Sequence, residues 1–131
     1  MPFETELTGD CMGIVHVGSG IVTGSEILEA CRSVTALVQT TENFHYKLVD
    51  LTAARDLQIS EEELRDIVEE DRLIAHERPQ AVVAIVAPNE KMRVIARHWQ
   101  GLVAELGWTT QIVRNRAEAT AWLHEHTGAP A

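Results

Sequence analysis

The stretch PQAVVAIVAP, residues 79–88, decides the fold. Between its two prolines, residues 81–87 form an uninterrupted apolar run with the length of a strand. A strand with one solvated face alternates apolar and polar residues, whereas a strand covered on both faces is apolar throughout. The run therefore predicts a parallel strand at the centre of a sheet, covered on both of its faces.

Helical patterns lie on both sides of this run along the chain. Residues 92–106 place apolar side chains on one stripe, and the pattern stops at Gly107, a residue typical of helix ends. The preceding helix opens with a capping box at residues 60–63, SEEE. Another capping box at residues 23–26, TGSE, predicts a helix over residues 24–38. Both boxes satisfy backbone N–H groups that a helix start leaves unpaired.

Strand-like stretches alternate with these helices. The expected strands cover residues 12–17, 44–51, 81–87 and 108–114, after a first β-like run from residue 4. Turns are predicted at residues 8–10 and 18–20, and the longest loop at residues 53–59. An N-cap signature at residues 115–118 opens the last helix.

This order of elements predicts the fold class. We expect a single α/β domain over residues 1–131, with an N-terminal β-hairpin followed by alternating helices and strands. Alternation requires crossover connections, so the mixed sheet is expected to be largely parallel and accompanied by four helices.

Composition excludes several classes of protein. The chain of 131 residues carries a net charge of −9, which opposes binding to nucleic acids and to anionic membranes. No apolar run approaches the roughly 20 residues that cross a bilayer, and the N-terminus does not have the pattern of a signal peptide. Cys11 and Cys31 are widely spaced and form no C-x-x-C motif. We therefore expect a cytoplasmic protein that is not integral to a membrane and has two reduced, buried thiols.

The sequence contains no motif for catalysis, metal binding or a cofactor. The six histidines have no ligand spacing, and residues 18–20 contain only part of a dinucleotide fingerprint. We expect a non-enzymatic protein without cofactors; the least favoured alternative is a small enzyme that uses Asp50 with His98.

Several short stretches together resemble a known family. They are residues 20–26 (GIVTGSE), 48–52 (LVDLT), 84–88 (AIVAP), 107–108 (GW) and 119–123 (ATAWL). With the order of elements, they resemble the SpoIIAA-like group of bacterial STAS-fold proteins over nearly the whole chain. The resemblance implies a small non-enzymatic cytoplasmic protein that binds a small apolar or lipid-like ligand or contacts a regulatory protein.

Ser60 is the candidate phosphorylation site that this resemblance implies. The related anti-sigma factor antagonists carry a D-S-S-G turn in which a serine is phosphorylated, and residues 58–61 stand in the corresponding place here. Only Ser60 matches, because Glu61 replaces the glycine. A role as helix cap also explains Ser60, and a phosphate would meet the negative charges of residues 61–63. We favour the capping role.

The carboxyl ends of the predicted strands form the first candidate binding site. Ligands collect at this edge of a parallel sheet. The polar residues expected there are Asp50, Thr52, Asn89, Arg114 and Asn115, together with Thr23 and Ser25 at the first helix. Caps and turns explain several of them without a ligand.

The predicted third helix carries the second candidate site. Lys91, Arg93, Arg97 and His98 cluster near its start, above an apolar wall formed by Met92 and Trp99. A phosphate, a carboxylate or a lipid head group fits such a cluster. The alternative is a solvated face whose bases pair with Glu90, with Glu105 or with the acidic second helix.

Two further features of the helices lead to expectations. Asp71 lies on the apolar stripe of the second helix and needs either a distant base or a position at the rim, which we favour. Val94 and Gly101 lie off the core stripe of the third helix and suggest a homodimer. As a whole, the sequence predicts a binding module for a small apolar or amphipathic ligand. The alternative is a regulatory protein-interaction module of the antagonist type.

Overall fold

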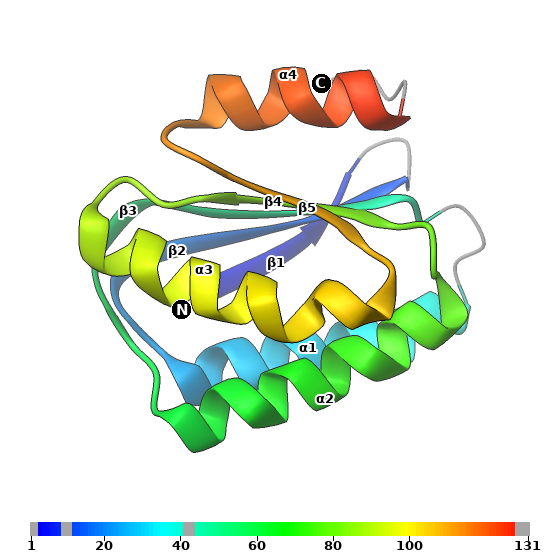
Figure 1. Cartoon of the computed structure of the whole chain (residues 1–131), viewed down its shortest axis with the longest axis horizontal. Coiled ribbons are helices and arrows are strands. Elements are labelled where there is room, and N and C mark those ends of the chain that lie inside the picture. The colour runs from blue at the N-terminus through cyan, green and yellow to red at the C-terminus, as the bar shows by residue number, and fades with distance from the viewer. Residues whose placement is uncertain (1–2, 9–11, 41–43, 128–131) are drawn as a thin grey trace.

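The computed structural model describes residues 3–8, 12–40 and 44–127. In chain order the elements are β1 (Phe3–Leu7), β2 (Gly13–Thr23), α1 (Gly24–Val38), β3 (Tyr46–Gln58), α2 (Glu61–Glu77), β4 (Val82–Val86), α3 (Glu90–Val103), a 3-10 turn η1 (Ala104–Leu106), β5 (Thr109–Val113) and α4 (Arg116–Thr127). The strand order in the sheet is β1-β2-β3-β4-β5 (Figure 1). β1 is antiparallel to β2 and the other neighbours are parallel, as the order of elements predicts.

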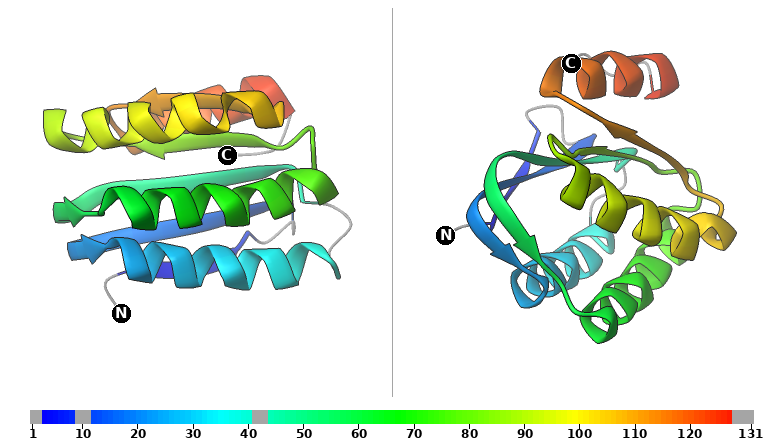
Figure 2. Two further views of the ribbon diagram at one scale, coloured as in Figure 1. Left: turned by 60° about the horizontal axis from the view of Figure 1, so that its bottom comes forward. Right: turned by 60° about the vertical axis from the view of Figure 1, so that its left-hand side comes forward.

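The helices divide unequally between the two faces of the sheet (Figure 2). α1, α2 and α3 cover one face, called here the three-helix face, and α4 alone covers the other, called the α4 face. α4 contacts β3, β4 and β5. Each face has its own cluster of buried apolar side chains. β4 is buried along its whole length between these layers, as the apolar run predicts.

The position of β4 differs from the prediction. It lies between β3 and β5, and the central strand is β3. The N-terminal hairpin adds two strands on the side of β3, which moves the middle of the sheet away from β4.

The predicted turn at residues 18–20 and the predicted loop at residues 53–59 are both wrong. β2 continues to Thr23 through a local irregularity, where Gly20 adopts a left-handed φ of 62°. β3 continues to Gln58, and the two strands remain paired beyond the end of β4. Backbone pairing between distant stretches stabilises these polar and glycine-containing segments as strands. The predicted turn at residues 8–10 and Cys11 lie mostly outside the described residues.

The predicted helix ends are confirmed. Thr23 and Ser60 each form a complete capping box, and Asn89 accepts a bond from the backbone N–H of Met92. Gly107 adopts φ 88° after η1, a left-handed conformation that favours glycine.

Candidate functional site

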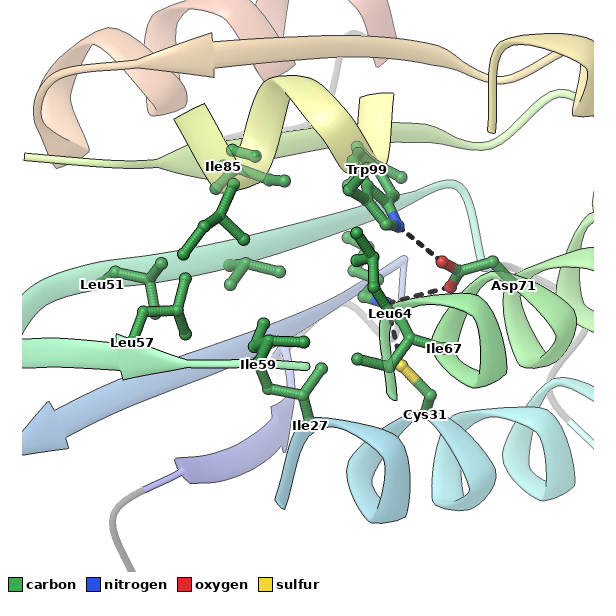
Figure 3. Close-up of a pocket in the computed structure, with 15 residues that line it drawn as sticks. Ile27, Cys31, Leu51, Leu57, Ile59, Leu64, Ile67, Asp71, Ile85 and Trp99 are labelled. Atoms are coloured by element: carbon green, nitrogen blue, oxygen red, sulfur yellow. Dashed lines mark hydrogen bonds and ion pairs between the residues drawn. The ribbon is translucent and has the colours of Figure 1, made fainter. Parts of the chain in front are cut away.

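A cavity of about 70 Å³ lies between the three-helix face of the sheet and the helices that cover it (Figure 3). Its lining comes from five elements and the β3–α2 connection: Val49, Leu51 and Leu57 with Lys47 from β3, Val83 and Ile85 from β4, Ile59 from the connection, Ile27 and Cys31 from α1, Leu64, Ile67 and Asp71 from α2, and Ile95, Ala96 and Trp99 from α3. Most of these side chains are apolar. The cavity is therefore a space in the hydrophobic core, with polar groups at one end.

The two-residue repeat of a strand and the spacing of residues along a helix bring these side chains to one place. Alternate residues of a strand share a face, so Lys47, Val49 and Leu51 point together toward the helices. Leu64, Ile67 and Asp71 recur on one side of α2 at helical spacing. In consequence, a lysine from the central strand meets an aspartate from a helix inside the core.

The polar end of the cavity consists of Cys31, Lys47, Asp71 and Trp99, called here the polar cluster (Figure 3). Trp99 Nε1 donates to Asp71 Oδ2 over 2.7 Å. Lys47 Nζ lies 3.6 Å from Asp71 Oδ1 and donates to Cys31 Sγ over 3.7 Å. Lys47 is 4% exposed and Asp71 is 0% exposed, so the ion pair is shielded from water.

Burial governs the protonation of the polar cluster. It raises the pKa of the Cys31 thiol to about 11, against the opposing charge of Lys47. Burial also raises the pKa of Asp71, although Lys47 and the bond from Trp99 oppose the change. Burial alone lowers the pKa of Lys47, but Cys31 and Asp71 outweigh it and the net pKa is raised. At neutral pH the sulfur is an unreactive thiol and Lys47 is an ammonium group.

An open groove adjoins the cavity between α2 and α3. Ile59, Leu64 and Ile95 line both the cavity and a surface depression of about 370 Å³. Ser60, Glu61, Val94 and His98 complete that depression. The three shared apolar side chains form the boundary between the cavity and the depression.

The expectation that Asp71 lies at the rim is wrong. Asp71 is enclosed, and the partner is a base distant in sequence, Lys47 on β3. Sequence reasoning missed Lys47 as a site residue. The available signal was a single lysine inside the otherwise largely apolar predicted strand at residues 44–51, since a buried lysine requires an acidic partner.

Asp50 and Thr52 have a separate role from the cavity. Asp50 belongs to the opposite face of β3, where it accepts bonds from the Thr52 backbone and hydroxyl and, over 3.0 Å, from Arg116 of α4. Burial raises its pKa, but these bonds outweigh that effect and the net pKa is lowered. Because α3 and α4 lie on opposite sides of the sheet, Asp50 and His98 do not come together.

The basic residues at the start of α3 have partners within the protein. Lys91 Nζ lies 2.6 Å from Asp56 Oδ1, and Arg97 Nη2 lies 3.5 Å from Glu90 Oε1. Arg93 contacts Glu90 and also donates to the Ala87 carbonyl.

The pairing of Arg93 and Arg97 with Glu90 matches the expectation for a solvated face, whereas Glu105 pairs with Arg72 of α2 and Lys91 with Asp56 of β3. Lys91 also lines a second open depression beside Ser60. Trp99 lies below this surface in the polar cluster, and Asn89 acts as a cap.

Ser60 caps α2, as predicted. It accepts a bond from the backbone N–H of Glu63, and Glu63 Oε1 accepts one from the Ser60 backbone. Ser60 is exposed, and its phosphorylation stays a prediction.

The described residues contain neither a metal-binding cluster nor a membrane-spanning helix. Within residues 3–8, 12–40 and 44–127, no group of three or more histidine, cysteine and acidic side chains is placed to hold a metal ion. None of the helices in the described part is both long and apolar enough to cross a membrane.

Comparisons with known proteins identify the fold. No family model and no curated protein matches the sequence. Among solved structures, the chain is similar to an uncharacterized protein of the DUF3478 family with a SpoIIAA-like fold from Shewanella loihica PV-4, with 16% identity, a TM-score of 0.56, and coverage of 92% of this chain and 91% of that one. It is also similar to the anti-sigma factor antagonist SpoIIAA in its unphosphorylated form, with 10% identity, a TM-score of 0.62, and coverage of 93% and 97% respectively. The chain therefore has a SpoIIAA-like fold.

Proposed function

We propose that this chain, a SpoIIAA-like fold with a cavity in its core, is a non-enzymatic cytoplasmic module that binds a small apolar or amphipathic ligand. The observation that carries the proposal is the cavity between the three-helix face and its helices. A well-packed interior contains few voids larger than a water molecule, and the cavity is about 70 Å³. One water requires roughly 10–15 Å³ on the same measure.

The chemistry of the lining selects the apolar part of the ligand. Aliphatic side chains dominate the lining, so each methylene group that enters contributes about 0.8 kcal/mol of favourable transfer free energy. The groove outside Ile59, Leu64 and Ile95 provides the path into the cavity and room for the rest of a longer ligand.

Binding is tested with the purified protein and short alkyl probes. Trp99 lines the cavity, so its fluorescence and its indole N–H resonance report occupancy. Native mass spectrometry of protein purified from its own source cell, followed by extraction, identifies a natural ligand. We expect saturable binding of alkyl probes and a copurifying amphipathic molecule.

A filling variant provides the matched control. Ala96 lines the cavity and is buried, and Ala96→Leu adds three carbon atoms there. It should weaken binding at least about tenfold, which corresponds to about 1.4 kcal/mol. Ala36→Leu makes the same change on the exposed side of α1 and should leave binding unchanged. Equal binding by the two variants would contradict the proposal.

Regulation of a partner protein is the second candidate function. It is favoured by the likeness to SpoIIAA, which is named as an anti-sigma factor antagonist. Leu73 on α2 and Val94 on α3 are each 52% exposed and offer apolar contact points. Loss of a copurifying regulator on Val94→Glu or Ser60→Glu, with the fold intact, supports this function; an unchanged set of partners opposes it.

Self-association through Val94 and Gly101 belongs to the same proposal. Both positions are exposed, and an added Cβ at Gly101 has no neighbour within 4 Å. Size-exclusion chromatography with light scattering should show a dimer that Val94→Glu dissociates. A monomer at every protein concentration would contradict self-association.

A further inference from the structure

The protein's own groups do not complete the polar cluster. The two contacts of Lys47 Nζ, 3.6 Å to Asp71 Oδ1 and 3.7 Å to Cys31 Sγ, are long. An N–H···O bond ordinarily spans about 2.7–3.2 Å. Among the described residues, no group makes a hydrogen bond to Asp71 Oδ1. An enclosed carboxylate oxygen without a donor is costly in free energy, so this end of the cavity favours a group that supplies one.

The arrangement around Asp71 leaves Oδ1, which lies 3.6 Å from Lys47 Nζ and accepts no hydrogen bond from the described residues, at the polar end of the cavity. Trp99 holds the other carboxylate oxygen, Oδ2, over 2.7 Å and fixes the orientation of the group. Asp71 and Lys47 both line the cavity. Figure 3 shows the polar cluster at one end, with Leu51 and Leu57 at the other.

Of a hydroxyl, a carboxylate, an ammonium and a methyl group, only the hydroxyl satisfies both charges. A hydroxyl donates its hydrogen to Asp71 Oδ1 and accepts from Lys47 Nζ. A carboxylate accepts from Lys47 but meets Asp71 with like charge, and an ammonium meets Lys47 in the same way. A methyl group leaves both unsatisfied.

The geometry points to a small neutral alcohol as the ligand class, with its hydroxyl between Lys47 Nζ and Asp71 Oδ1 and its alkyl part along the apolar lining. The inference rests on the proposed ligand-binding function and specifies which ligands that function selects. It also assigns a role in specificity to Lys47 and Asp71.

The first test compares three probes of equal chain length on the unaltered protein: 1-hexanol, hexane and hexanoate. In a purely apolar cavity hexane binds more tightly than 1-hexanol, because the hydroxyl loses its hydrogen bonds to water. We expect the reverse order, with 1-hexanol at least as tight as hexane and at least about tenfold tighter than hexanoate. Binding of 1-hexanol should shift the NMR signals of the Lys47 ammonium and the Trp99 indole N–H.

The second test removes both charges of the Lys47–Asp71 ion pair together. Lys47→Met with Asp71→Leu keeps approximate volume and leaves no unpaired charge. Hexane affinity should stay within about threefold, while 1-hexanol affinity should fall at least about tenfold. Glu70→Gln is the matched control, since Glu70 neighbours Asp71 on α2, accepts a bond from Thr35, and does not line the cavity.

The outcomes separate the inference from the proposed function. If none of the three probes binds, the proposed function fails. If hexane binds more tightly than 1-hexanol, or the double variant weakens both equally, the function stands and the inference is overturned. If the double variant does not fold, the order of the three probe affinities on the unaltered protein decides whether the inference holds.

Discussion

The two faces of the same sheet are built on different principles. On the α4 face, Tyr46, Leu48 and Val86 pack with α4 in an apolar layer, beside an Asp50–Arg116 ion pair whose arginine is 49% exposed. On the three-helix face, Lys47 stands between Tyr46 and Leu48 in the chain, yet it enters a core that contains an ion pair and a cavity. A buried ion pair is a weak source of stability, and a cavity lowers stability. Proteins tolerate destabilising features where function requires them. The ion pair and the cavity therefore favour the three-helix face as the location of the candidate site.

The largest expected effect comes from breaking the ion pair. Asp71→Ala leaves Lys47 charged and enclosed and removes the acceptor of the Trp99 indole, so it should destabilise the fold by about 3–5 kcal/mol. Denaturant unfolding measures the change.

The paired replacement is the control for this effect. Lys47→Met with Asp71→Leu should be substantially more stable than Asp71→Ala, since neither charge stays unpaired. If the two variants lose equal stability, lost packing and not an unpaired charge explains the loss. The two faces of the sheet would then differ less than we argue.

The next prediction compares one leucine from each face. Leu48 is 2% exposed on the α4 face, and Leu64 is 5% exposed beside the cavity. Leu48→Ala opens a new void in a layer of buried apolar side chains and should cost about 3–4 kcal/mol. Leu64→Ala only enlarges a space that Leu64 already borders, so it should cost about 2–3 kcal/mol. Unfolding in urea measures both; a larger loss for Leu64→Ala contradicts this account of the packing.

A smaller effect concerns His16, which belongs to the three-helix face. His16 stacks on Phe3 and contacts the Thr5 hydroxyl through Nδ1 over 2.7 Å. Burial, with a smaller influence of Lys47, holds the pKa of His16 well below its ordinary value of 6.5. Below pH 6.5 the unfolded chain therefore binds a proton that the folded chain does not.

The stability that comes from neutral His16 is fully present above pH 6.5 and declines as the pH falls below that value. The slope from this single group is at most about 1.4 kcal/mol per pH unit. His16→Asn should remove the slope, as unfolding measured from pH 7 to pH 5 shows, whereas exposed His98→Asn should retain it. An equal slope in both variants would assign the effect to other groups.

The sequence predicted local features well and long-range ones poorly. Thr23 and Ser60 cap helices through bonds to residues three positions away, so a short window contains all the necessary information. The continuous strand through Gly20 depends on pairing with distant β3, which no local pattern contains. The sequence did not predict the polar cluster for the same reason: it marks Asp71 as unusual, but the partner Lys47 is supplied by the tertiary fold.

The smallest expected effects come from two helix caps, one on each face of the sheet. They should be equal, because the difference between the two faces lies in the core and not in the caps. Ser60 caps α2 on the three-helix face, and Asn115 accepts from the backbone N–H of Glu118 at the start of α4 on the other. Both positions are exposed. Ser60→Ala and Asn115→Ala should therefore each cost about 1 kcal/mol, because a cap acts on its own helix and does not depend on the core below. Thermal unfolding of the two variants measures this. A loss of stability for Ser60→Ala well above that for Asn115→Ala would mean that the start of α2 supports the cavity as well as its own helix. Ser60 would then belong to the candidate site.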